Sequence, residues 1–203
     1  AYGFAVGNGA SATSIQMDCN FGQRAFAYTA PSGFKALNTQ NLATPTIGAT
    51  PTTQAGEYYN AVLWTGTGAP QNISVGFDPD MVWIKARGTT RDHFVLDRLR
   101  GITNNLLTPN LTRAEITATY INSTNSDGFQ LATGDTGNNG PGETYVAWNW
   151  KANGAGVTNT AGTITSTVSA NTTSGFSVVT WTADGTTATV GHGLGVAPKM
   201  IIV

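Results

Sequence analysis

Charged side chains are scarce in this sequence, at 10% of its 203 residues, whereas a globular domain usually carries about a quarter. The formal net charge is −1, and the basic residues are scattered. The densest basic group, within residues 87–100, is interleaved with Asp92 and Asp97. Because nucleic-acid-binding proteins neutralise phosphates with clustered lysine and arginine, this pattern predicts no nucleic-acid partner.

Cysteine and long apolar segments are also missing. Cys19 is the single cysteine, so the sequence predicts neither an internal disulfide nor a cysteine-ligated zinc site. No apolar run approaches the roughly 20 residues that span a membrane. No basic segment followed by an apolar one opens the chain, as it does in a signal peptide. We therefore expect no membrane insertion.

Threonine, serine, asparagine and glycine supply the polarity that charge does not. Threonine favours strands, whereas glycine and asparagine favour turns. Runs such as "PDMVWIKAR" and "ETYVAWNWKA" alternate with period two, as strands with two distinct faces do. In the first run Met81, Trp83 and Lys85 share a face, and in the second Trp148 and Trp150 do. Short strands separated by glycine-rich turns predict an all-β fold of the β-sandwich type.

One long repeat runs through the chain. The stretch "YYNAVLWTGTG" is matched by "GFSVVTWTADG", so that Trp64 falls on Trp181 and Gly68 on Gly185. A period of about 117 residues is far longer than the roughly 20–50 residues of solenoid or propeller repeats. It has the length of a whole sandwich domain, and we expect two such modules in tandem.

The two ends of the sequence shape the same interpretation. The first residue is not Met, and the chain stops at "KMIIV", where Met200 matches Met81 after a two-residue insertion. This apolar run has the pattern of a strand that is beginning. We interpret the sequence as a segment of a longer polypeptide, in which the last strands find partners in further chain or in a neighbouring subunit.

Composition divides the chain into five expected parts. They are residues 1–47, with alternating strands around Cys19; a Pro/Thr-containing linker, 48–56; a β-sandwich module, 57–152; an uncharged hairpin or connector, 153–174; and the truncated start of a second module, 175–203. The expected fold class is thus all-β, with tandem β-sandwich modules of the jelly-roll or concanavalin-like kind that are partial at both ends.

Several of these stretches resemble a known group of proteins. "VGFDPDMVWIKAR", "NSDGFQLATG", "ETYVAWNWKANG" and "ITSTVSANTTSGFSVVTWT" are similar to a module repeated in bacteriophage tail-fibre, tail-spike and related virion proteins. "DCNFGQRAFAYTAPSGFKALNTQNL" resembles the closing strands of a SPRY-like domain, which precedes that module in such proteins. The resemblance covers nearly the whole chain and implies β-sandwiches in both domains.

The resemblance also implies a role. It points to a non-enzymatic structural protein of the virion, assembled in the bacterial cytoplasm and exposed on the particle in a fibre, spike or surface appendage. It implies other virion proteins as partners, a homo-oligomer of three copies, and attachment to the host, whose surface glycans are a possible ligand. A polysaccharide depolymerase and a carbohydrate-binding adhesin module are the alternatives.

The segment "RDHFVLDRLRG" holds the densest set of reactive side chains. A hydrolase would use His93 as a base oriented by Asp92 or Asp97, but no Gly-x-Ser-x-Gly nucleophile motif accompanies them. In a strand His93 and Asp97 would lie roughly 13 Å apart, which is too far for a hydrogen bond. We expect Asp97 to pair with Arg100 across a turn, and we assign no catalytic residue.

Metal and cofactor sites are not predicted either. His93 and His192 belong to different modules and have no second ligand at useful spacing, and we expect His192 to bond to the backbone of its glycine-rich turn. The segment from Asp135 to Glu143, "DTGNNGPGE", carries oxygens suited to calcium but does not match an EF-hand loop. We expect a plain exposed loop there.

Two further ligand classes depend on residues that the sequence alone does not bring together. A glycosidase would need two carboxylates about 5–10 Å apart; the available ones are Asp80, Asp97, Asp127 and Glu143. A sugar-binding face would use exposed aromatic rings. Matched positions predict core packing for Trp64 and Trp181, and core or interface packing is expected for Trp83, Trp148 and Trp150.

Overall fold

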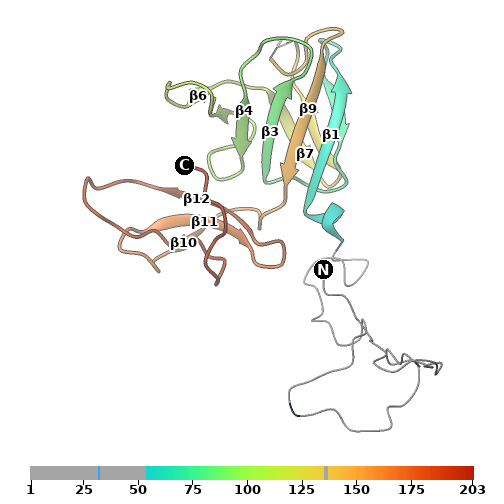
Figure 1. Ribbon diagram of the computed structural model, residues 1–203. Helices are drawn as coiled ribbons and strands as arrows, with labels where there is room; N and C mark the ends of the chain where they lie inside the picture. Colours follow the sequence, from blue (N-terminus) through green and yellow to red (C-terminus); the bar gives the residue numbers. More distant parts are fainter. Residues whose placement is uncertain (1–31, 33–53, 135–136) are drawn as a thin grey trace, which may run out of the picture. The chain divides into compact units, whose positions relative to one another are not determined.

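The computed structural model describes Ser32 and residues 54–134 and 137–203 (Figure 1). The chain divides into two compact units, Ala1–Thr44 and Pro45–Val203, and all elements discussed below belong to the second. The SPRY-like strands expected within residues 1–47, the environment of Cys19 and most of the expected linker lie outside the described residues.

The described part of the chain contains strands and one 3-10 turn but no α-helix, so the predicted all-β class is confirmed. No helix in this part of the chain is long and apolar enough to cross a membrane. The elements are η3 (Ala55–Glu57), β1 (Tyr59–Thr65), β2 (Gln71–Ser74), β3 (Met81–Ala86), β4 (Phe94–Asp97), β5 (Asn105–Leu106), β6 (Ile116–Thr117), β7 (Ile121–Asn125), β8 (Gly128–Leu131), β9 (Thr144–Trp150), β10 (Val157–Asn159), β11 (Ser166–Asn171) and β12 (Phe176–Trp181).

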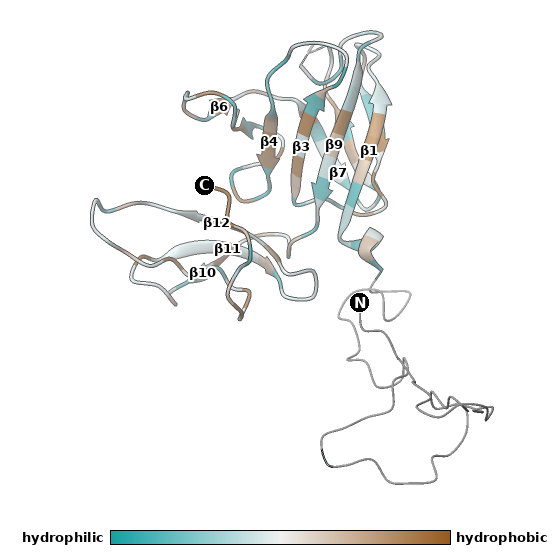
Figure 2. Cartoon of the chain, viewed as in Figure 1, coloured by the Kyte–Doolittle hydropathy of each residue, from teal (hydrophilic) through white to brown (hydrophobic). Residues whose placement is uncertain are grey.

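The largest sheet has the order β1-β9-β3-β4 and is antiparallel throughout. Its strands alternate in burial, most regularly β3 and β9, as the period-two pattern of their sequences predicts. Figure 2 shows apolar stretches in the middle of all four strands. β9 is the last strand of this module in sequence, yet it lies between β1 and β3. The first strand of the module therefore pairs with the last.

A second antiparallel sheet, β2-β8-β7, supplies the other layer of the sandwich. Residues of both sheets form one core, and Phe129 of β8 meets Trp64 of β1 edge to face, with ring centroids 6.3 Å apart. The segment "LTRAEITATYI" forms only the two-residue β6 before β7 begins at Ile121. The cause is pairing: β6 meets only the two residues of β5.

Trp64 belongs to this core. It is 8% exposed, stacks on Tyr145 at 5.5 Å, and its indole Nε1 donates to the Asn138 carbonyl at 3.0 Å. Burial of such a ring contributes on the order of 2–3 kcal/mol to stability, and the hydrogen bond satisfies the indole N–H group. The predicted core role of Trp64 is confirmed.

The expected connector takes part in a third sheet, β10-β11-β12, which is also antiparallel. The repeat is visible in the backbone: β1 and β12 are strands, and Gly68 and Gly185, which follow them, have φ of 76° and 80°. Only glycine adopts such angles without strain. The matched tryptophan differs, because Trp181 is 43% exposed, so the prediction of core packing in both copies is wrong for Trp181.

The other matched strand also differs between the copies. Met81 begins β3, which is paired on both sides, whereas Met200–Val203 are exposed and form no strand. A strand requires a hydrogen-bonding neighbour, and within residues 54–134 and 137–203 this segment has none. The expected strand at "KMIIV" is therefore not observed.

Replacement of Trp64 by Ala is expected to lower the free energy of unfolding by about 3–5 kcal/mol, since it removes a buried ring and leaves a cavity. Trp181→Ala is the matched control at the repeated position, and we expect a loss below about 1 kcal/mol because the ring is half exposed. Urea denaturation followed by circular dichroism measures both. Equal losses would contradict the different environments of the two rings.

Candidate functional site

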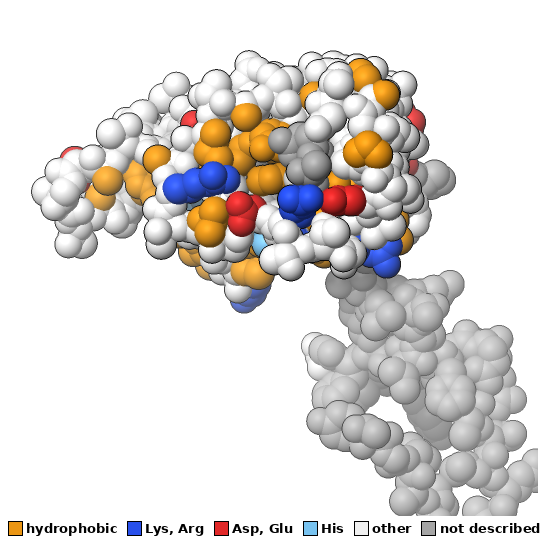
Figure 3. Space-filling view, turned by 90° about the horizontal axis from the view of Figure 1, so that it is seen from above, with side chains coloured by type: hydrophobic (Ala, Val, Ile, Leu, Met, Phe, Trp, Pro, Cys, Tyr) orange, Lys and Arg blue, Asp and Glu red, His pale blue; other side chains and the backbone are white. Residues whose placement is uncertain are grey.

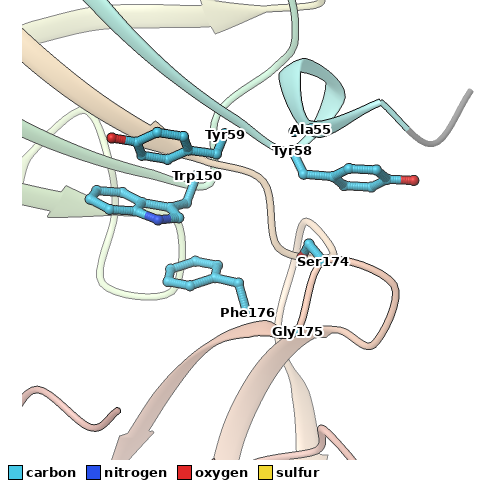
Figure 4. A pocket seen from close by; sticks show the side chains of 7 residues that line it. All are labelled: Ala55, Tyr58, Tyr59, Trp150, Ser174, Gly175 and Phe176. Carbon is cyan, nitrogen blue, oxygen red and sulfur yellow. The ribbon is translucent and has the colours of Figure 1, made fainter. Parts of the chain in front are cut away.

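An aromatic stack lies at the end of the large sheet where the sandwich meets the third sheet. Trp150, the last residue of β9, has Tyr59 on one side with ring centroids 5.3 Å apart, and Phe176 on the other at 5.9 Å and 19° between planes. Figure 4 shows the three rings one above another. Phe176 occupies the repeat position of Tyr59, so equivalent residues of the two copies flank the same tryptophan.

A pocket opens beside this stack. It is lined by Ala55, Tyr58, Tyr59, Trp150, Ser174, Gly175 and Phe176, and has a volume of about 240 Å³. The lining contains four aromatic residues and no charged one, and Tyr58 points away from the stack (Figure 4). Aromatic and hydroxyl groups without charge are suited to a small neutral ligand such as a sugar ring, and unsuited to a phosphate or a metal ion.

A buried carboxylate fixes the chain where it leaves the sandwich. Asp80 is 4% exposed, and its Oδ2 accepts hydrogen bonds from the backbone amides of Ala152 at 2.8 Å and Gly154 at 3.2 Å. Its Oδ1 accepts from Arg98 Nε at 2.6 Å, and Arg98 also bonds to the more exposed Asp78. The chain segment that leads into the third sheet is thus held by the Asp80 carboxylate, whose charge Arg98 balances.

Burial lowers the pKa of Arg98, but the hydrogen bonds and charges of Asp80 and Asp78 outweigh it and raise this pKa above its ordinary value. The guanidinium therefore stays charged, as the buried Asp80 requires.

The third sheet holds the same segment from the other side. The side-chain amide of Asn171, at the end of β11, donates to the Ala152 carbonyl at 3.1 Å, and the amide of Asn153 donates to Ser169 Oγ at 2.9 Å. Together with Asp80 and the aromatic stack, these bonds make residues 151–154 a joint with partners in both sheets, here called the joint.

The segment "DTGNNGPGE" is not the exposed loop that the sequence predicts. Asn138 and Asn139 are fully buried. Asn139 donates to the carbonyls of Ala69 and Ala132 and accepts from the Thr67 amide. The side-chain amide of Asn139 thus faces the protein interior and joins strand connections, whereas the buried Asn138 Oδ1 has no hydrogen-bond donor among the described residues. Asp135 lies outside the described residues.

Glu143, at the end of this loop, closes a small polar network. Its carboxylate accepts from Arg91 at 3.0 Å, from Thr89 at 3.1 Å and from the Tyr145 hydroxyl at 3.0 Å. The hydrogen bond from Arg91 is the main reason that the pKa of Glu143 is lowered. Seen from above, Lys/Arg and Asp/Glu side chains lie beside one another, not in a patch of one sign (Figure 3).

Burial is the main cause that raises the pKa of Tyr145 to about 12, and the Glu143 carboxylate contributes while the Gly140 amide opposes. The phenol therefore remains neutral, and its hydroxyl donates a hydrogen bond to Glu143.

His93 makes hydrogen bonds that link neighbouring segments of the fold. Its Nδ1 accepts from Trp83 Nε1 at 3.0 Å, and its amide donates to Asn110 at 2.9 Å. Burial and then Lys85 lower the pKa of His93, against the opposing effect of Asp92. A neutral imidazole with an accepting Nδ1 fits both observations.

The expected pairing of Asp97 with Arg100 is confirmed. Arg100 Nε lies 2.6 Å from Asp97 Oδ2, and the Arg100 amide donates to Oδ1 at 3.0 Å. Three of the four carboxylates considered for a glycosidase, Asp80, Asp97 and Glu143, are each bound by a different arginine. Each therefore has a structural partner, which is not the arrangement of a paired acid and base.

His192 lies in its glycine-rich turn as predicted, where its Nδ1 accepts from the Leu194 amide at 3.2 Å. Across residues 54–134 and 137–203, no group of three or more His, Cys, Asp or Glu side chains is placed to hold a metal ion.

Three tryptophans lie outside the core cluster, on the outer side of the large sheet. Trp83, Trp148 and Trp150 are all partly exposed, and Trp83 meets Trp148 edge to face at 6.2 Å. Of the core or interface packing expected for them, packing against a neighbouring sheet is observed for Trp150, and an interface role stays a prediction for Trp83 and Trp148. The alternation in β3 and β9 predicted that these side chains share a face of the sheet. It did not predict which face packs against the core.

Asp80→Ala is expected to destabilise the protein by about 3 kcal/mol or more, because it removes the acceptor of two backbone amides and the more buried of the two carboxylates that neutralise Arg98. Asp78→Ala is the matched control: it bonds to the same arginine but its side chain is 43% exposed, and we expect less than about 1 kcal/mol. Chemical denaturation of both variants decides between them, and similar losses would contradict the role assigned to Asp80.

Tyr145→Phe tests the polar network around Glu143. A folded-state pKa of about 12, against an ordinary 10.0, means that the neutral phenol stabilises the fold below pH 10 and that this contribution is lost as pH rises toward 12. Stability of the original protein should fall over this window more than that of Tyr145→Phe. Denaturation at several pH values measures the difference, and parallel curves would refute it.

Comparison with known proteins gives one match. No curated protein and no solved structure matches the chain, whereas a family model described as "Domain of unknown function (DUF7483)" matches residues 54–203. That range spans the sandwich, the joint and the third sheet. The chain therefore belongs to the DUF7483 domain family.

Proposed function

We propose that this protein is a non-enzymatic structural component of a bacteriophage virion. It forms part of a tail fibre, spike or surface appendage that projects from the particle and takes part in attachment to the host. Its partners are other virion proteins and further copies of itself, three in the assembly that the sequence resemblance implies. It is assembled in the bacterial cytoplasm and exposed on the finished particle.

The joint is the observation that supports this proposal most. A projecting appendage must transmit force from one module to the next without bending freely. Here the segment between the sandwich and the third sheet is bonded on both sides, by Asp80 and by Asn171, and the Trp150–Phe176 stack adds apolar contact. A flexible Gly/Ser linker would offer none of these bonds.

The polar groups support the non-enzymatic part of the proposal. Catalytic acids and bases are usually poised, with perturbed pKa values and open access to a substrate. In the described residues Asp80 and Asp97 are buried against arginines, and His93 accepts from Trp83. These side chains are engaged in holding strands together.

A carbohydrate-binding module is the second candidate, and the pocket beside Trp150 favours it. Its neutral aromatic lining, with Tyr58, Tyr59 and Phe176, has the composition of sugar sites. This function is compatible with a virion appendage that touches surface glycans, and it also fits an adhesin outside any virus. No arrangement of the described residues favours a polysaccharide depolymerase.

Labelling of intact particles tests the first proposal. Antibodies raised against this chain are expected to decorate an appendage of the phage that encodes it, as seen by electron microscopy, while pre-immune serum leaves the particles bare. Absence of the chain from purified particles, checked by mass spectrometry, would refute the virion role. Release of reducing sugar from host polysaccharide by the purified chain would refute its non-enzymatic character.

A further inference from the structure

The outer side of the large sheet carries an apolar row across all four strands. Ala61 of β1 pairs with Trp148 of β9, Trp148 with Trp83 of β3, and Trp83 with Val95 of β4. Since residues two apart on a strand share a face, the next row continues with Leu63 and its partner Val146. We call these six side chains the outer face.

Such a face is unusual for an antiparallel sheet that meets water on one side. Sheets of that kind alternate apolar residues toward the core with polar residues outside. Here the core side of β9 buries Tyr145 and Ala147, and its outer side presents Val146 and Trp148. Leu63 is 63% exposed. The sheet thus has the composition of one that is covered on both sides.

Two polar side chains of β3 on this side have a hydrogen-bond partner within the chain. Trp83 Nε1 donates to His93 at 3.0 Å, and Lys85 Nζ donates to the Ala86 carbonyl at 2.9 Å. Removing a neutral donor such as the Trp83 indole from water is costly only when it loses its partner, whereas a charged ammonium would need a compensating charge. Covering the outer face therefore leaves the Trp83 donor bonded, and the contact keeps the Lys85 ammonium, which neighbours Val146, at its margin in water.

One end of the same side is already covered by an element of this chain. Trp150 lies two residues beyond Trp148 on β9, so both point outward, and Phe176 of β12 stacks on Trp150. Phe176 matches Tyr59 in the repeat. The surface that begins at this contact continues across the outer face, and the element observed at its end is β12, the strand that matches β1 in the sequence repeat.

We propose that the outer face docks onto a second copy of this chain. The inference deepens the proposed role as an assembly component and rests on it. The face offers no cluster of charge that would select a nucleic acid or a charged peptide, since Lys85 is the one cation on β3 and the carboxylate of Asp97 is engaged by Arg100. A neutral sheet face is matched by another neutral sheet face.

The size of the face sets the expected strength. Four strands span about 14 Å across, and two rows add about 7 Å along them. Stable interfaces bury about 800 Å² per partner, several times this core, so one face gives a weak contact with a dissociation constant in the micromolar range or above. Repetition of modules along an appendage would multiply that contact.

Sedimentation equilibrium of the full chain between about 10 and 500 µM tests the proposal. We expect the mean mass to rise with concentration toward two or three copies. Leu63→Lys should weaken association at least about tenfold, by placing a charge in the contact. Val157→Lys is the matched control, because Val157 is 65% exposed but lies on β10, and it should leave association unchanged. Circular dichroism confirms that both variants fold.

A chain that stays monomeric at every concentration would overturn the proposal. So would association that Leu63→Lys and Val157→Lys weaken equally, or that neither affects. Failure of particle labelling with self-association intact would overturn the proposed virion role and leave the docking surface standing, so the two failures are distinguishable.

Discussion

The module depends on β9, the strand from Thr144 to Trp150, because both edges and both faces of this strand are in use. Its edges bond to β1 and β3, which have no ladder with each other. Its inner side chains, with Tyr145 stacked on Trp64, fill the core. Its outer side ends in Trp150, which receives Phe176 from the following sheet. A single alternating segment therefore joins the sheet, the core and the joint.

Charge is scarce in this protein, and several of the described charges hold parts of the structure together. Asp80 and Asp97 are each held by an arginine, and Glu143 binds Arg91. A buried ion pair contributes little net stability but is costly to break, so such pairs define one arrangement of the strands more than they strengthen it. This economy fits a protein whose work is to keep a shape, and it leaves the neutral outer surfaces available for contact with similar surfaces.

The sequence predicted those features that depend on neighbours along the chain. Alternation in β3 and β9 specified their two faces, and the spacing of Asp97 and Arg100 specified their pair. Features that depend on distant residues were not predictable. The sequence around Asn139 predicts an exposed loop, because the strands that bury this residue are distant in sequence. Trp181 matches Trp64 in sequence, but the aromatic neighbours of Trp64, Phe129 and Tyr145, come from later strands. The joint likewise has no local signal.

The strand order has a consequence for synthesis on the ribosome. β1 emerges first, but its only ladder partner among the described strands is β9, so Tyr59 must wait until Trp150 has been made. At about 5–20 residues per second this interval lasts several seconds. Meanwhile the pairs β3–β4, β5–β6 and β7–β8 have their partners nearby in sequence. The nascent module thus carries an open apolar strand for most of its translation, a period in which chaperones or neighbouring nascent chains have access to it.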